Sequence, residues 1–238
     1  MNILLTNDDG IRSEGLQKFA EILRVRLKHR VYVIAPESNR SAISHALSIL
    51  YTPIKLSQMD ENTWSCSGTP ADCVFVALLG ELPEKPDLII SGINQGENLG
   101  TDIIYSGTAA AARQASHSGI PAIALSLAAR DVYNWDMAVS WAADHLEEIL
   151  AHWKEGSFLN VNIPNSAEGP KGMIITWPAI KHYRETLKVV TDLNNDRWCF
   201  LASGDELPTN EAGSDCDVVS RNYVSVSCVY NYPIVKKD

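Results

Sequence analysis

The chain contains 238 residues, of which 45% are hydrophobic and 21% are charged, so it is long and apolar enough to form one substantial core. Its formal net charge of −9 argues against a broad basic surface, and we therefore expect no binding to duplex nucleic acid. Because no apolar run approaches the roughly 20 residues that span a bilayer, and no basic stretch followed by a long apolar segment opens the chain, we expect a cytoplasmic protein without membrane contact.

The first 36 residues alternate between strand and helix patterns. Residues 3–6 form a short continuous apolar run, as expected for a strand in a sheet that is covered on both faces. A helix follows, because Leu16, Phe19 and Leu23 recur at three- and four-residue steps, and Ser13 is a suitable N-cap. Residues 31–35 form a second apolar strand that ends at Pro36. Strand, helix and strand in this order predict a βαβ unit, which builds a parallel sheet.

The same alternation continues to about residue 164. The apolar patterns predict helices over residues 72–79, 108–117 and 135–153, and strands over residues 87–91, 121–125 and 159–163. We therefore expect an α/β fold with a mainly parallel sheet and helices on both of its faces.

The character of the sequence changes near residue 170. Helical periodicity fades, and short strand-like runs follow one another, separated by turn residues, at 172–177, 187–191, 197–202 and 223–230. The segment DLNND, between the second and third of these runs, predicts the tip of a hairpin. We expect an α/β core over residues 1–170 and a β-rich extension over residues 171–238. Isolated hairpins are marginally stable, so such an extension is suited to packing on a partner or a neighbouring subunit.

Polar segments follow several of the predicted strands, where ligands bind in open parallel sheets. They are NDDG at residues 7–10, PESNRSAISH at 36–45 and SGINQGENLGTDIIYSGT at 91–108. Two carboxylates together with hydroxyl and amide oxygens form an all-oxygen site suited to Mg²⁺, Mn²⁺ or Ca²⁺. The last segment leads directly into a helix, whose N-terminus favours a bound anion such as phosphate. This combination indicates metal-assisted hydrolysis of a phosphoester.

Five segments of the sequence together resemble the survival protein SurE family of nucleotide phosphatases. They are LLTNDDGI, APESNRSA, SGTPADCV, SGINQGENLGTDIIYSGTAAAA and GIPAIALS, and the resemblance extends from residue 1 to about residue 165, more thinly beyond. It implies 5′-nucleotidase activity on nucleoside monophosphates with one divalent cation per subunit, a Rossmann-like core, and homodimers or homotetramers joined through the C-terminal region.

The resemblance also implies roles for individual residues. The metal ligands would be Asp8, Asp9, Ser41 and Asn94, and Asp8 would also orient or deprotonate the attacking water. The phosphate pocket would be lined by Asn7, Asn98, Ser106, Gly107 and Thr108.

Other interpretations of the same residues remain open from the sequence. The two aspartates would also suit a solvated turn, and Ser106 and Thr108 would suit ordinary helix caps. Arg40 either meets the substrate or is solvated, and His45 is either a proton donor to the leaving group or structural. A nucleotide-binding regulatory module without turnover is the alternative function. A dinucleotide-dependent oxidoreductase is disfavoured, because NDDGIRSEG follows the first strand in place of GxGxxG.

Overall fold

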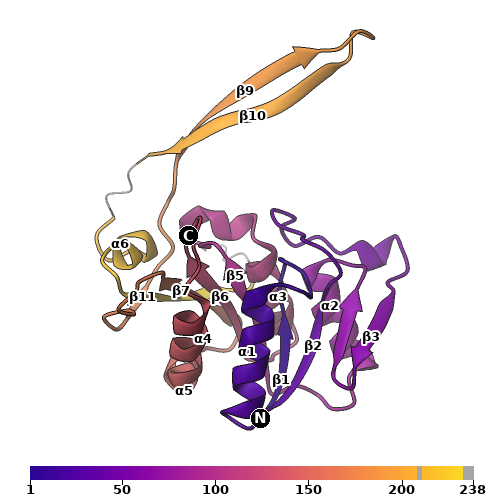
Figure 1. Ribbon diagram of the computed structural model, residues 1–238, viewed down its shortest axis with the longest axis vertical. Helices are drawn as coiled ribbons and strands as arrows, with labels where there is room; N and C mark the ends of the chain where they lie inside the picture. Colours follow the sequence, from indigo (N-terminus) through magenta and orange to yellow (C-terminus); the bar gives the residue numbers. More distant parts are fainter. Residues whose placement is uncertain (208–210, 233–238) are drawn as a thin grey trace, which may run out of the picture.

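The computed structural model describes residues 1–207 and 211–232 and places most of them in one sheet flanked by helices (Figure 1). The sheet has nine strands in the order β3-β4-β2-β1-β5-β6-β7-β11-β8, and β9 and β10 form a separate hairpin. The strands are β1 (Asn2–Thr6), β2 (Arg30–Pro36), β3 (Leu56–Asp60), β4 (Thr63–Cys66), β5 (Leu88–Gln95), β6 (Ala122–Ala128), β7 (Ser157–Pro164), β8 (Met173–Thr176), β9 (Tyr183–Thr191), β10 (Arg197–Glu206) and β11 (Val224–Tyr230). The helices are α1 (Glu14–Val25), α2 (Pro70–Val76), α3 (Gly107–His117), α4 (Trp135–Asp144), α5 (Leu146–Leu150) and α6 (Asp215–Ser220).

The centre of the sheet is parallel and buried on both faces. Strands β2, β1, β5, β6 and β7 pair in parallel. Their continuous apolar sequences reflect this burial, because α1 and α4 cover one face and α2 and α3 cover the other (Figure 1). The prediction of a Rossmann-like α/β fold with a mainly parallel sheet is therefore confirmed.

One predicted helix is wrong, and two strands are additional. The single helix expected over residues 135–153 is divided into α4 and α5 at His145, whose φ of −109° and ψ of 11° are not helical. The His145 ring stacks on Trp141, and its Nδ1 lies 2.8 Å from the Trp141 carbonyl oxygen, a local interaction that competes with continuation of the helix. The additional strands β3 and β4 lie at one edge of the sheet and carry no continuous apolar run.

The C-terminal region is shared between the sheet and the hairpin. Strand β11 pairs antiparallel with β7 and parallel with β8, so both become part of the main sheet. Strands β9 and β10 pair only with each other and project away from the rest of the molecule (Figure 1). The predicted β-rich extension is therefore present, with its turn between Thr191 and Arg197. The division of the chain at residue 170 into a catalytic and an oligomerisation region stays a prediction.

The helices are short. The longest in the described ranges, α1, has 12 residues, whereas a bilayer requires about 20. Within residues 1–207 and 211–232 no helix is both long enough and apolar enough to cross a membrane. The cytoplasmic location stays a prediction.

Asp72 joins the segment that follows Ser41 to the start of α2. Its buried carboxylate accepts hydrogen bonds from the backbone N–H groups of Ser48 (3.0 Å), Ile49 (3.2 Å) and Thr69 (2.9 Å), and from the Ser48 hydroxyl. Thr69 in turn accepts from the Asp72 N–H, which completes a capping box. Burial acts to raise the pKa of Asp72, but the hydrogen bonds outweigh it, so the pKa lies below the ordinary value of 3.8.

Replacing Asp72 by asparagine is therefore expected to lower the free energy of unfolding by about 2 kcal/mol at neutral pH. A carboxyl whose pKa is lower in the folded state stabilises the fold above its unfolded-state pKa, and this contribution is lost as the pH falls through its folded-state pKa. Urea titrations near neutral pH and near pH 3 will measure the effect, and the difference between wild type and variant should shrink at the lower pH. Asp60→Asn, at an exposed position, is the control, and an equal loss at both pH values would contradict this account.

Candidate functional site

The turn after β1 is shaped by Asn7 and Gly10. The Asn7 amide nitrogen donates to the Gly10 carbonyl (3.0 Å) and to Ser13 Oγ (2.6 Å), and Asn7 Oδ1 accepts from the Gly10 N–H (3.1 Å). Gly10 has a φ of 105°, and a Cβ there would lie 3.1 Å from the Ser38 carbonyl carbon, so the turn needs glycine. Asn7 is thus fully buried as a brace of the turn and is not among the residues that line the cavity described next. Ser13 precedes α1 as predicted, but its hydroxyl meets Asn7 and makes no cap bond.

A cavity of about 220 Å³ lies beyond the carboxyl ends of β1, β2 and β5, and we call it the strand-end cavity. It brings together five of the predicted site residues, which come from four separate segments of the chain. They are Asp8, Ser41, Asn94, Asn98 and Ser106, and the other lining residues are Ala42, Gln95, Asp102 and Tyr105. Segments far apart in the sequence therefore supply oxygen-bearing side chains to one small space.

Thr108 and Gly107, at the start of α3, contact the Asp8 side chain. The Thr108 hydroxyl donates to Asp8 Oδ1 over 2.5 Å, and both residues are buried. A Cβ on Gly107 would lie 2.8 Å from the Asp8 Cβ and 2.9 Å from its Oδ2, so only glycine lets α3 approach this closely. Both residues therefore fix the Asp8 carboxylate, and neither is among the residues that line the cavity.

Asp9 lies beside the strand-end cavity, outside its lining. Its Oδ2 accepts from the backbone N–H of Gln95 over 2.9 Å, which joins the β1 turn to the end of β5. Burial raises the pKa of Asp9 to about 6, against the lowering effect of the Gln95 N–H, and the charge of Asp8 adds to the increase. Burial likewise raises the pKa of Asp8, although the Thr108 hydroxyl opposes it. One buried and one half-buried carboxylate side by side are therefore unfavourable as anions unless a cation accompanies them.

Asn94 is presented by an irregularity in β5. The register of β5 against β6 shifts between Ser91 and Asn94, and Gly92 approaches the Leu125 carbonyl so closely that a Cβ would collide with it. The Asn94 amide nitrogen donates to the Gly96 carbonyl over 2.8 Å. Its side-chain oxygen is thereby the atom that remains for a ligand in the cavity it lines.

Asn98 is held by a network of polar residues on β6 and β7. Its amide nitrogen donates to Ser126 Oγ (2.8 Å), and its backbone N–H donates to Asn162 Oδ1 (2.8 Å). Its carbonyl oxygen accepts from the amides of Asn160 (2.8 Å) and Asn162 (3.1 Å). These supporting residues were not predicted, although asparagines at alternate positions of an apolar strand, in LNVNI, are a signal that would have identified them.

The N-terminus of α3 opens at the cavity. Ser106 is its N-cap, since the serine Oγ accepts from the Ala109 N–H over 3.0 Å. The backbone N–H groups of Gly107 and Thr108 meet the Asp8 carboxylate, and the positive end of the helix dipole favours an anion at this place. The cap interpretation and the phosphate interpretation of Ser106 are compatible.

The C-terminal region secures the loop that carries Asn98. The buried Asp215 carboxylate accepts from the backbone N–H groups of Gly100 (2.7 Å) and Ala179 (2.9 Å), so it joins the loop to the segment after β8. Lys181 Nζ lies 2.8 Å from Asp102 Oδ2, to which the Tyr183 hydroxyl also donates over 2.6 Å. Neither Asp215 nor Lys181 stands in a local motif, so sequence patterns do not identify them.

Arg40 and His45 are not among the residues that line the strand-end cavity. The Arg40 guanidinium donates to the Ser67 carbonyl over 3.1 Å, while its backbone N–H donates to the Asp8 carbonyl over 2.7 Å. His45 Nε2 lies 3.0 Å from Gln114 Oε1, and burial lowers the pKa of His45. The structural interpretation of His45 agrees with these contacts, whereas Arg40 is half-buried and bound to a backbone carbonyl instead of being solvated.

The donor set suits a hard cation. Across the described part of the chain, no group of three or more His, Cys, Asp or Glu side chains is arranged to hold a metal. The candidate set instead has the buried carboxylate of Asp8 and the half-buried carboxylate of Asp9, together with a serine hydroxyl and an asparagine carbonyl, at or beside one cavity. Mixed carboxylate and neutral oxygen donors are what Mg²⁺, Mn²⁺ and Ca²⁺ accept, so the residues present fit such an ion.

Replacing Thr108 by valine is expected to lower kcat for phosphomonoester hydrolysis at least about tenfold, because valine keeps the shape and removes the hydroxyl that fixes Asp8. Thr108→Ser keeps the hydroxyl and is expected to stay within about threefold of wild type. Steady-state kinetics with p-nitrophenyl phosphate will compare the two variants. Equal activities in both would mean that the hydroxyl has no part in positioning Asp8.

Comparisons with known proteins agree with one another. The family model described as "Survival protein SurE" matches residues 3–185. A 5′-nucleotidase SurE of Prochlorococcus marinus is 42% identical over 211 residues, covering 85% of this chain and 77% of that protein. A 5′-nucleotidase SurE of Pelobacter propionicus is 37% identical over 243 residues, covering 99% and 97%. The crystal structure of a SurE protein from Aquifex aeolicus matches with a TM-score of 0.86 and 34% identity, covering 98% of this chain and 95% of that one.

Proposed function

Because this chain belongs to the survival protein SurE family, it is a 5′-nucleotidase, and we propose that it hydrolyses nucleoside 5′-monophosphates in the strand-end cavity. The observation that carries the proposal is the convergence of Asp8, Ser41, Asn94 and Asn98 on one cavity beside the N-terminus of α3. Acidic and amide side chains and the N-cap of α3 therefore share one small space. A phosphate and a cation are the two ligands that such a combination favours.

One divalent cation, Mg²⁺, Mn²⁺ or Ca²⁺, would be held by Asp8, Asp9, Ser41 and Asn94. Such an ion, when bound, polarises a phosphoryl oxygen and lowers the pKa of a bound water. The carboxylate of Asp8 would orient the attacking water and accept its proton, with Thr108 keeping the carboxylate in place. Ser106 and Asn98 would donate to the phosphate oxygens, and the positive end of the α3 dipole would favour the phosphate. Asn98 is held for this by its buried network.

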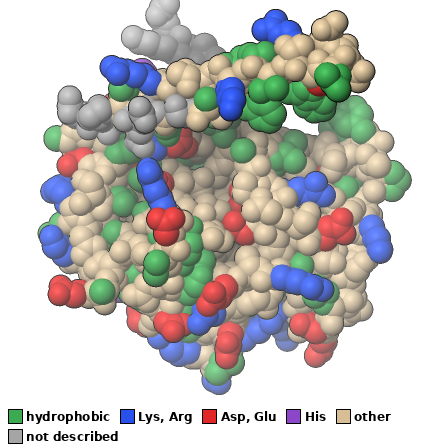
Figure 2. Space-filling view, turned by 45° about the horizontal axis from the view of Figure 1, so that its top comes forward, with side chains coloured by type: hydrophobic (Ala, Val, Ile, Leu, Met, Phe, Trp, Pro, Cys, Tyr) green, Lys and Arg blue, Asp and Glu red, His purple; other side chains and the backbone are tan. Residues whose placement is uncertain are grey.

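We also infer that the hairpin of β9 and β10 joins copies of this chain into a homodimer or homotetramer. Large apolar side chains are exposed on both of its faces, among them Leu187, Val190, Trp198 and Phe200. Figure 2 shows hydrophobic side chains, in green, gathered on the surface of the hairpin. A two-stranded ribbon is marginally stable by itself in water, so apolar contacts with another subunit would stabilise it.

Phosphate release from AMP, with and without Mn²⁺, tests the proposed activity. The purified chain is expected to release phosphate with added Mn²⁺, and excess EDTA is expected to reduce the rate by at least about 100-fold. Restoring Mn²⁺ should restore the rate, which controls for denaturation by the chelator. Binding of AMP without any metal-dependent release would instead favour a regulatory nucleotide-binding module.

A further inference from the structure

A second hollow adjoins the strand-end cavity, and we call it the hairpin-base groove. Its volume is about 580 Å³, and it lies between the 3₁₀ turn Gly100–Ile104 and the beginning of the hairpin. Ala42, Asp102 and Tyr105 line both hollows, so the two lie directly against each other. In the space-filling view the surface beneath the hairpin is hollowed (Figure 2).

The volumes of the two hollows suit different parts of a nucleotide. The strand-end cavity, about 220 Å³, lies below the range of roughly 300–1,000 Å³ that is usual for sites of drug-sized ligands. It has room for a phosphate and a cation, whereas the nucleoside has to continue beyond it. The hairpin-base groove falls inside that range and begins where the strand-end cavity ends.

The walls of the groove suit a nucleobase. The Tyr183 hydroxyl donates to Asp102, and Lys181 Nζ lies 5.4 Å from the centre of the Tyr183 ring, so the ring is held in place. Burial and the bond to Asp102 raise the pKa of Tyr183 to about 12, and the hydroxyl therefore stays protonated and donating. Ile104 and Leu201 add exposed apolar surface to the lining. Flat aromatic and apolar surfaces bind bases through stacking with little selectivity among them.

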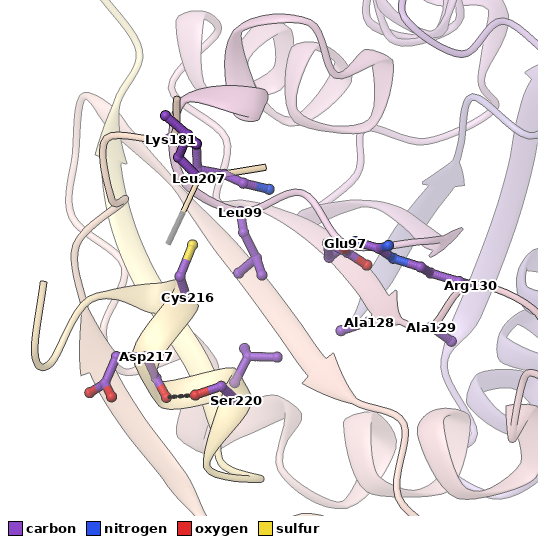
Figure 3. A pocket seen from close by; sticks show the side chains of 11 residues that line it. Glu97, Leu99, Ala128, Ala129, Arg130, Lys181, Leu207, Cys216, Asp217 and Ser220 are labelled. Atoms are coloured by element: carbon purple, nitrogen blue, oxygen red, sulfur yellow. Dashed lines mark hydrogen bonds and ion pairs between the residues drawn. The ribbon is translucent and has the colours of Figure 1, made fainter. Parts of the chain in front are cut away.

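A larger cavity on the other side of the loop is the competing location (Figure 3). Its volume is about 680 Å³, and Glu97, Leu99 and Arg130 line it together with residues of α6. It shares no lining residue with the strand-end cavity among the described residues. Glu97 and Leu99 flank Asn98 in the chain, and the Asn98 side chain lines the strand-end cavity instead. A phosphate beside Asn98 would therefore have to pass the loop to place its nucleoside there.

We propose that the hairpin-base groove is the nucleoside subsite, in which the base packs on Tyr183 and the ribose passes Tyr105 at the junction with the strand-end cavity. The inference rests on the proposed function and assigns the part of the substrate that lies beyond the phosphate. It makes the beginning of the hairpin part of substrate binding, separate from the role of its apolar faces in assembly.

Steady-state kinetics with AMP and with ribose 5-phosphate, which lacks the base, test the assignment. Tyr183→Leu is expected to raise KM for AMP about fivefold, the low end of what loss of one base–aromatic stack produces, with a much smaller change for ribose 5-phosphate. Tyr183→Phe keeps the ring and should restore most of the affinity for AMP. Tyr105→Leu is expected to raise KM for both compounds, because Tyr105 stands next to the ribose.

Arg130→Ala, in the competing cavity, is the matched control and should leave KM for AMP unchanged. The proposal is overturned if Tyr183→Leu leaves KM for AMP unaltered, or if Arg130→Ala raises it selectively. Titration of each variant with Mn²⁺, followed by calorimetry, separates a local effect from a disturbed fold, because the groove variants should bind Mn²⁺ like wild type. If instead the proposed function itself is wrong, the wild-type chain will hydrolyse neither AMP nor ribose 5-phosphate.

Discussion

Asp8→Asn is expected to lower kcat for AMP by at least about 10³-fold while the fold stays intact. The amide has the shape of the carboxylate, and its oxygen still accepts the Thr108 hydroxyl, so the local packing is kept. The substitution removes the negative charge that would attract a cation and accept a proton from water. Since a buried amide is less costly than a buried carboxylate, the melting temperature in EDTA should equal or exceed that of wild type.

Three measurements decide this prediction: phosphate release in Mn²⁺, Mn²⁺ affinity by calorimetry, and thermal unfolding in EDTA. Asp131→Asn makes the same change of charge at an exposed position between β6 and α4 and should behave like wild type. If Asp8→Asn keeps kcat within about tenfold of wild type, Asp8 has neither of the proposed roles.

Placing glutamates at Trp198 and Phe200 is expected to separate the proposed oligomer into monomers. Trp198 and Phe200 pair with Val190 and Lys188, respectively, and therefore stand on one face of the hairpin, with 57% and 52% of their surfaces exposed. Burying two carboxylates at an interface costs several kcal/mol, which is enough to abolish an ordinary association. Light scattering coupled to size-exclusion chromatography will measure the mass.

The control for this variant adds the same charge elsewhere. Thr52→Glu with Gln58→Glu changes two exposed positions close to the opposite edge of the sheet and should leave the mass unchanged. A wild-type chain that is monomeric, or a hairpin variant that keeps the oligomeric mass, would argue against assembly through the hairpin.

The central strands were predictable because strands that are buried on both faces have continuous apolar sequences. The residues of β1 and β2 face helices on both sides, and a strand with one face in water would alternate apolar with polar residues instead. The edge strands β3 and β4 are partly exposed and mix polar with apolar residues, so their pattern does not differ from that of a loop. The break at His145 depends on how one ring packs on Trp141, a tertiary detail that helical periodicity does not contain.

The candidate site was predictable as far as it depends on the ends of neighbouring strands. Asp8 and Asn94 follow the β1 and β5 patterns, and parallel pairing of those strands brings them to one edge. The supporting residues depend on contacts across long stretches of chain: Asp215 meets Gly100 over a separation of 115 residues, and Asn160 meets Asn98 over 62. No local pattern specifies such a pair, because either partner would be acceptable in many other settings.

The bond from Asp215 to Gly100 also bears on the order in which the protein is completed during synthesis. The turn after β1 leaves the ribosome early, but the loop of Asn98 lacks this anchor until residue 215 has emerged. Strand β11, which lies between β7 and β8, arrives later still. The nascent chain therefore carries Asp8 and Asp9 long before Asp215 can anchor the loop of Asn98, so the candidate site is assembled well after its acidic residues have been synthesised.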